Sequence, residues 1–126
     1  MKRTYATCFP VLLLILLCVF SSEALANKTA VRIEVPESAE KGTEITIKVH
    51  VTHDGNNFLH YTNWVSIKIN DQEVKRWKFS MFRRPKSDKF TLEIKYLLNE
   101  SITVVAEANC NRHGSDGAKT ATVSVK

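Results

Sequence analysis

A thiol and an imidazole lie three residues apart in the stretch Cys110-Asn111-Arg112-His113-Gly114, near the end of the chain. Residues 102–109 have the alternation of a strand, so Cys110 shares the inward-facing side of Ala106 and Ala108. The glycine that closes the stretch allows the tight turn that would bring the histidine round to the cysteine. Because thiolates and imidazoles are common ligands of transition metals, this pair predicts half of a metal site.

The remaining histidines can supply the other ligands. They are His50, His53 and His60, and with His113 they make up all four histidines of the sequence. The candidate metal ligands are therefore His53, His60, Cys110 and His113. Three histidines and one cysteine also suffice for a closed tetrahedral zinc site, so the ligand types alone leave the metal open.

The first 26 residues have the pattern of a secretory signal peptide. Lys2 and Arg3 precede an unbroken apolar run at residues 11–20, and Ala24-Leu25-Ala26 is a small-x-small cleavage site. The run is shorter than the roughly 20 residues that a membrane-spanning helix needs. We therefore predict a signal peptide at 1–26, cleavage near Ala26, and an exported protein, periplasmic or secreted, made of residues 27–126.

Processing would change both the cysteine count and the charge. Cys8 and Cys18 leave with the leader, so the mature chain keeps Cys110 alone and cannot form an internal disulfide. A lone thiol in an oxidising compartment is usually paired with another molecule, buried, or held by a metal. Because the leader carries two positive charges and one negative charge, the formal net charge falls from +5 to +4, which suits an anionic substrate or partner.

The mature chain has the pattern of a single all-β domain. Residues 27–126 are enough for one hydrophobic core and not for two. Apolar residues recur with a period of two in seven segments that are separated by polar turns. The segments are 31–35, 45–51, 61–69, 74–79, 90–96, 102–109 and 118–125. This pattern predicts an immunoglobulin-like antiparallel β-sandwich of about seven strands.

The same alternation predicts where each histidine points. In the segment 45–51 the apolar residues are odd-numbered, so His50 lies on the opposite, polar face. His53 lies just beyond, where the strand enters a loop, and His60 opens the following strand. Loops at one end of the sandwich can therefore gather the four candidate ligands. We expect His50 to remain a solvated histidine outside the group.

These residues carry a resemblance to a known family. His53 and His60 followed by Tyr61-x-x-Trp64, and Cys110-Asn111-x-His113-Gly114, resemble the iron-binding domain of the superoxide reductases, the desulfoferrodoxin and neelaredoxin family. The likeness covers essentially the whole mature chain. It implies a mononuclear iron held by histidine nitrogens and by the Cys110 thiolate, with one axial position open. It also implies reduction of superoxide to hydrogen peroxide with an electron from a small donor protein.

The resemblance also shows where this chain departs from the family pattern. The family's fourth histidine corresponds to Thr29, so the resemblance implies three ring nitrogens here instead of four. Lys28 matches the family's lysine, and a positive side chain near the open position would attract the superoxide anion. The spacing from His53 to His60 is one residue longer than usual. Ser115-Asp116 replaces an aromatic residue that commonly follows the glycine.

Two functions from different classes follow from these features. In the first, the protein is an iron-dependent oxidoreductase in which Lys28 and Cys110 take part in catalysis. In the second, it is a non-enzymatic exported module that binds zinc or another metal, or a partner, and has lost the reductase reaction. For both we expect no nucleic acid and, after processing, no membrane as partner, and both are compatible with a homo-oligomer.

Basic residues gather in one part of the sequence. They are Lys75, Arg76, Lys78, Arg83, Arg84, Lys86 and Lys89. The simplest interpretation is a solvated strand edge and loop whose charges discourage pairing with other strands. The alternative is a surface that binds an anion or a partner.

Overall fold

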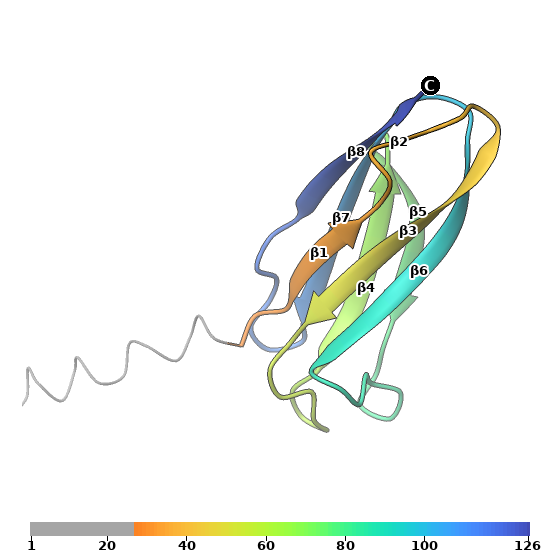
Figure 1. Cartoon of the computed structure of the whole chain (residues 1–126). Coiled ribbons are helices and arrows are strands. Elements are labelled where there is room, and N and C mark those ends of the chain that lie inside the picture. The colour runs from red at the N-terminus through yellow and green to blue at the C-terminus, as the bar shows by residue number, and fades with distance from the viewer. Residues whose placement is uncertain (1–26) are drawn as a thin grey trace, which may run out of the picture.

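A computed structural model describes residues 27–126 as an all-β sandwich (Figure 1). The predicted signal peptide at 1–26, with Cys8 and Cys18, lies outside the described residues. The strands of the described part are β1 (Ala30–Glu34), β2 (Ser38–Ala39), β3 (Thr43–Thr52), β4 (Thr62–Ile69), β5 (Gln72–Lys78), β6 (Lys89–Leu98), β7 (Ile102–Cys110) and β8 (Lys119–Val125). Seven of them match predicted segments, and the short β2 is the addition. The predicted fold class is confirmed.

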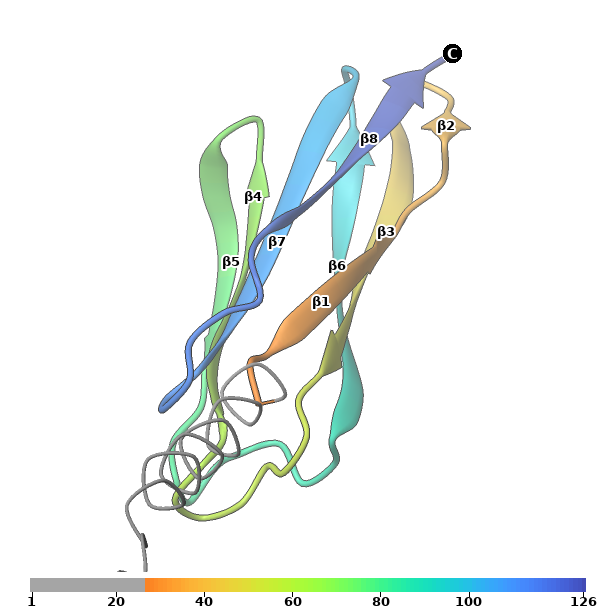
Figure 2. The same ribbon diagram turned by 90° about the vertical axis from the view of Figure 1, so that its left-hand side faces the viewer.

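The strands form two sheets that face each other (Figure 2). One sheet has the order β1-β3-β6, and the other has the order β2-β8-β7-β4-β5. All of the pairings are antiparallel except that of β2 with β8, which is parallel. In the part of the chain that the structure describes, no helix is long and apolar enough to cross a membrane.

The core forms between the inner faces of the two sheets. On β3 the odd-numbered residues from Ile45 to Val51 are buried, and on β7 the even-numbered residues from Ile102 to Cys110 are buried. Each fully buried Val, Leu or Ile side chain contributes about 1.5–3 kcal/mol relative to an exposed one. The last inward position of β7 is therefore a cysteine at the edge of a well-packed core.

Three connections lie at the same end of the sandwich and position the candidate site. They are residues 53–61 after β3, residues 79–88 before β6, and residues 111–118 after β7 (Figure 1). Residues 27–29 enter β1 at this end too, because Thr29 pairs with Ser115. The fold thus brings segments that are far apart in the sequence to one place.

The start of β4 differs from the prediction. We expected His60 to open this strand with Tyr61 facing inward, but the strand begins at Thr62, and His60 lies in the loop before it. The register against β7 shifts between Thr62 and Trp64, which is the mark of a β-bulge. Because the bulge inserts one extra residue, the inward parity changes, and Thr62 is fully buried.

Candidate metal centre

The cysteine of the candidate centre is fixed by a tight turn after β7. The Cys110 amide donates to the Gly114 carbonyl at 2.9 Å, and the Gly114 amide donates back to the Cys110 carbonyl at 3.1 Å. Gly114 has φ +81, a left-handed conformation that glycine adopts without strain. The amides of Arg112 and His113 both point at the Cys110 sulfur, at 3.4 Å. Two such donors stabilise negative charge on a thiolate ligand.

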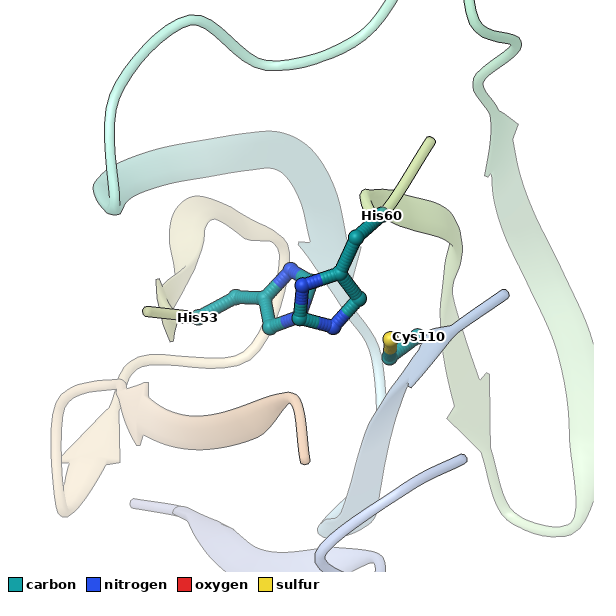
Figure 3. A group of neighbouring side chains, drawn as sticks. All are labelled: His53, His60 and Cys110. Carbon is teal, nitrogen blue, oxygen red and sulfur yellow. The ribbon is translucent and has the colours of Figure 1, made fainter. Parts of the chain in front are cut away.

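His53, His60 and Cys110 converge in space (Figure 3). One ligand atom from each lies within 4.8 Å of the others, although two of the residues come from the loop after β3 and the third from the end of β7. His113 joins the group through its Nδ1, which lies 2.9 Å from His60 Nε2 and 3.8 Å from Cys110 Sγ. The structure therefore brings the four predicted ligand residues to one end of the sandwich.

The spacing of the nitrogens tests whether the group fits a metal. His60 Nε2 lies 3.1 Å from His53 Nε2 and 2.9 Å from His113 Nδ1. With metal–nitrogen bonds of about 2.0–2.1 Å, two ligands at a right angle have nitrogens about 2.9 Å apart, and two ligands at a tetrahedral angle about 3.3 Å apart. The observed distances fit ligands at near right angles, although imidazole hydrogen bonds have the same length.

The Cys110 sulfur lies farther from His113 than a shared metal would require. A thiolate at a right angle to an imidazole would lie about 3.1 Å from its nitrogen, given bonds of about 2.3 and 2.1 Å. Cys110 Sγ lies 3.8 Å from His113 Nδ1, so the side chains would have to draw together by a fraction of an ångström around a metal. Rotation of the exposed His113 can supply such a movement, because its side chain is not packed in the core.

Hydrogen bonds of the fully buried His53 fix which of its nitrogens faces the group. Its Nδ1 lies 2.9 Å from Asn56 Oδ1, and the same oxygen accepts the Thr62 amide at 2.8 Å. Since this oxygen is an acceptor, His53 Nδ1 must carry the proton. The lone pair of His53 Nε2 is then directed at His60 and is available to a metal.

Thr29 lies next to this network. It is fully buried, and its hydroxyl lies 3.5 Å from the hydroxyl of Thr62, which in turn lies 3.1 Å from His53 Nδ1. The Thr29 amide donates to the Gly114 carbonyl at 3.3 Å, so the segment before β1 is tied to the cysteine turn. Lys28 precedes it and is half-buried.

Electrostatics favour a neutral imidazole at the middle of the group. Burial, followed by the positive charge that His53 and His113 would carry, lowers the pKa of His60 below its ordinary value. A neutral imidazole keeps a lone pair for a metal, whereas a protonated one does not. His60 can therefore act as a ligand at neutral pH.

His50 is not brought to the group. It lies on the outer face of the three-stranded sheet, where its Nε2 is 2.6 Å from Glu34 Oε2 and its Nδ1 is 2.8 Å from Thr91 Oγ1. The hydrogen bond from His50 lowers the pKa of Glu34. This is the polar strand face that the sequence alternation predicts.

Two asparagines hold the loops around the group: Asn111, which belongs to the Cys-Asn-x-His-Gly motif, and Asn56, which no sequence pattern singles out. Asn56 bridges His53 and Thr62 as described above. Asn111 accepts the Tyr61 amide at 2.9 Å and donates to the Leu59 carbonyl at 3.1 Å. Asn is a frequent hydrogen-bonding residue in loops, but the partners of these two depend on contacts between distant segments, which the sequence does not show.

Residues 21–116 match the model of the family described as desulfoferrodoxin. A comparison with curated proteins found no match.

Solved structures with a similar fold include two that are described as superoxide reductases and one sulfur carrier protein. The superoxide reductase (neelaredoxin) of Ignicoccus hospitalis has 18% sequence identity and a TM-score of 0.69, over 86% of this chain and 89% of that one. A Thermotoga maritima structure provisionally described as a superoxide reductase has 22% identity and a TM-score of 0.60, over 77% and 86%. The sulfur carrier protein SoxY of Chlorobium limicola has 17% identity and a TM-score of 0.55, over 76% and 78%. At these identities the likeness establishes the fold alone.

Proposed function

Because the chain belongs to the desulfoferrodoxin family, we propose that it is a mononuclear iron protein that reduces superoxide to hydrogen peroxide with an electron from an external donor. The observation that carries the proposal is the convergence of two pairs of residues from distant parts of the sequence, His53 with His60 and Cys110 with His113. The likeness of the fold to superoxide reductases of known structure supports it.

The donor set suits iron in a one-electron reaction. Imidazole nitrogens bind both ferrous and ferric iron, and a thiolate adds electron density to the metal. When bound, iron supplies one electron to superoxide, which with two protons gives hydrogen peroxide, and an external donor then returns the electron. His53, His60, His113 and Cys110 would hold this iron.

The residues of the chain have separate roles in this proposal. The amides of Arg112 and His113 donate to the Cys110 sulfur, and such hydrogen bonds would stabilise the negative charge of a thiolate bound to iron. The exposed side chain of His113 marks the side from which solvent and a small anion reach the group. Lys28 adds a positive charge near the entry and raises the rate at which superoxide arrives.

Export belongs to the same proposal. A signal peptide at 1–26 with cleavage near Ala26 would place the protein in the periplasm or outside the cell. Reduction of superoxide in the periplasm or outside the cell requires a donor protein in the same compartment. The small electron-transfer partner of the reaction is therefore an exported or membrane-exposed protein in this proposal.

The test measures the reaction of the ferrous protein with superoxide. After a pulse of superoxide, the wild-type protein should consume it and yield one peroxide per oxidised iron. Cys110→Ser should lower the rate by at least about tenfold, because it removes the thiolate.

Lys28→Ala should lower the rate two- to fivefold at low salt, and the loss should shrink as salt is added. Lys41→Ala, an exposed cation at the opposite end of the sandwich, is the matched control and should change nothing.

Metal analysis of protein purified from its own host completes the test. We expect iron, and an optical spectrum of the oxidised form with a thiolate-to-iron charge-transfer band that Cys110→Ser removes. Protein that contains zinc and leaves superoxide untouched would contradict the proposal and indicate a metal-binding module without the reaction.

A further inference from the structure

Three large apolar side chains are exposed together on two loops beside the candidate metal centre. They are Phe58, Leu59 and Phe82, with exposed fractions of 47%, 60% and 81%, and we call them the loop patch. The rings of Phe58 and Phe82 meet edge to face, with centroids 5.7 Å apart. The other large hydrophobic side chains that are exposed in the described part of the chain, Val74 and Leu97, belong to β5 and β6 and are not part of this group. Clustered exposed apolar side chains mark interaction sites more often than single ones do.

Hydrogen bonds between the two loops hold the loop patch in shape. The His53 amide donates to the Asp88 carbonyl at 2.8 Å, and the Gly55 amide donates to the Asp88 carboxylate at 3.1 Å. Asn56 Nδ2 donates to the Ser87 carbonyl at 3.0 Å. A surface that is already ordered loses little conformational entropy when a partner binds.

The loop patch is joined directly to the metal-site loop. The Leu59 carbonyl accepts hydrogen bonds from Asn111 Nδ2 at 3.1 Å and from Arg112 Nε at 2.9 Å. The next residue in the chain is His60, the central imidazole of the group. A partner seated on Leu59 would thus lie one residue from a candidate ligand.

Basic side chains surround the loop patch. Arg83, which follows Phe82 in the chain, and Lys86 of the same loop are exposed, and the Arg84 guanidinium lies 6.0 Å from the Phe58 ring centroid. Within residues 27–126 the ion pairs are His50–Glu34 and Arg76–Glu73, so these cations have no carboxylate partner there. Of the nearby acids, Asp54 is exposed and Asp88 already accepts the Gly55 amide. An apolar centre with an arginine-rich rim fits a partner that is acidic around an apolar centre.

We propose that the loop patch and its basic rim are the docking surface for an acidic electron-donor protein. The inference rests on the proposed function, because a donor must approach the metal closely. A surface of this kind suits the small, transient interfaces of electron-transfer complexes. It also gives a role to Arg83, Arg84 and Lys86. A partner-binding surface is one of the two interpretations that the sequence allows for these residues.

The experiment uses a plant-type [2Fe–2S] ferredoxin as the donor probe, because it is a small acidic electron carrier. Stopped-flow spectroscopy measures how fast reduced ferredoxin reduces the ferric protein. Phe82→Ala should lower the second-order rate about fivefold, and Arg83→Glu about tenfold at low salt. Leu97→Ala and Lys41→Glu are matched controls at the opposite end of the sandwich and should leave the rate unchanged. Reduction by ascorbate, which needs no docking, should be equal in all variants.

A binding measurement separates this inference from the proposed reaction. In the zinc-loaded protein, oxidised ferredoxin should shift the amide NMR signals of residues 53–61 and 79–88, and Phe82→Ala should weaken these shifts. If the ferrous form ignores superoxide but the zinc-loaded form shows the shifts, the proposed reaction is refuted and the docking surface is supported. Equal rates and shifts in Phe82→Ala, Arg83→Glu and the controls would overturn the inference. The inference would also be overturned if the loop patch bound anionic phospholipid vesicles and ferredoxin shifted the signals of other residues. The loop patch would then be a membrane-binding surface.

Discussion

Thr29 limits the number of nitrogens that the candidate centre can offer. By its resemblance to the family pattern, this position would hold the fourth histidine. In the structure its side chain is fully buried and reaches His53 through the Thr62 hydroxyl. Position 29 therefore lies two side-chain contacts from the candidate ligand His53.

Thr29→His should tighten iron binding by on the order of tenfold and raise the rate with superoxide. The reason is that a fourth imidazole adds a nitrogen beside the existing three without occupying the open side. Competition with a chelator measures the affinity. Thr29→Val is the matched control, because it breaks the contact with Thr62 but adds no nitrogen, and it should not tighten binding. A Thr29→His protein with unchanged affinity would show that position 29 does not face the metal.

The ligand residues could be predicted from the sequence, but the residues that hold them could not. A Cys-x-x-His pair and two further histidines are visible as residue types and spacings. The roles of Asn56 and Thr62 depend on how the loop 53–61 folds over β4, which no local pattern specifies. Loop conformation is set by contacts between distant segments, so its hydrogen bonds are known only from the structure.

The lowered pKa of His60 predicts a pH dependence of the metal-free protein. The unfolded chain binds a proton at His60 near the ordinary value of 6.5, and the folded chain binds it only at a lower pH. Between these two values the unfolded state carries more protons, so the free energy of unfolding falls as the pH falls below about 6.5.

Urea unfolding of the metal-free protein at several pH values between 8 and 5 measures this loss. His60→Gln cannot take up the proton and should show a smaller decrease over the same range. The carboxyl of Glu34 also has a lowered pKa, but the stability that it contributes is lost only below its ordinary value of 4.5. Identical slopes for the two proteins would contradict the assignment to His60.

At the scale of single elements, the β4–β5 hairpin shows a turn whose chemistry is suboptimal. Asn70 and Asp71 have φ values of 47 and 68, so both central residues are left-handed. This is the type I′ turn that matches the twist of a hairpin, for which Asn-Gly is strongly preferred. Asp71 therefore adopts a conformation that costs an ordinary residue free energy.

Asp71→Gly should raise the free energy of unfolding by about 0.5–1 kcal/mol, because glycine adopts the left-handed conformation without a side-chain clash. Thermal unfolding should show a midpoint several degrees higher, as expected for a domain of this size. Asp71→Ala is the matched control and should lower the midpoint, since alanine tolerates this conformation less well than aspartate. A lower midpoint in Asp71→Gly would show that Asp71 makes a stabilising contact that outweighs its strain.

Strand alternation predicts seven of the strands and the inward residues of β3 and β7. It fails at the start of β4, where the bulge between Thr62 and Trp64 reverses the inward parity. It also misses the two residues of β2, which pair in parallel with Ser124 and Val125. Such a short strand has too few residues to show a period, and a bulge depends on the partner strand and not on its own sequence.

At the scale of the whole molecule, the sandwich concentrates its polar chemistry at one end. The buried core separates the candidate metal centre from the turn at Lys41 and Gly42, at the other end of β3. The loop patch, its basic rim and the three candidate-ligand histidines all lie on the three connections at the metal-site end. Exchange of loop residues there can change the metal, substrate or partner while the core stays the same.

The predicted export determines the length of the mature chain and its number of thiols. Cleavage near Ala26 would leave a chain that begins near Asn27 and keeps Cys110 as its single cysteine. Because Cys110 is 2% exposed and lies beside three histidines, we expect no reactive thiol in the metal-bound protein. One thiol should react after chelation and unfolding.

Mass spectrometry of protein recovered outside the cytoplasm and titration with a thiol reagent measure both properties. Ala26→Glu places a charge at the cleavage site and is the matched control, because it should keep the leader and show three thiols after unfolding. Since Cys8 and Cys18 lie within the leader, the thiol count reports on processing independently of the mass. An exported wild-type protein that retains residues 1–26, or that carries a lipid on Cys18, would contradict the predicted cleavage and make the protein a membrane-anchored one.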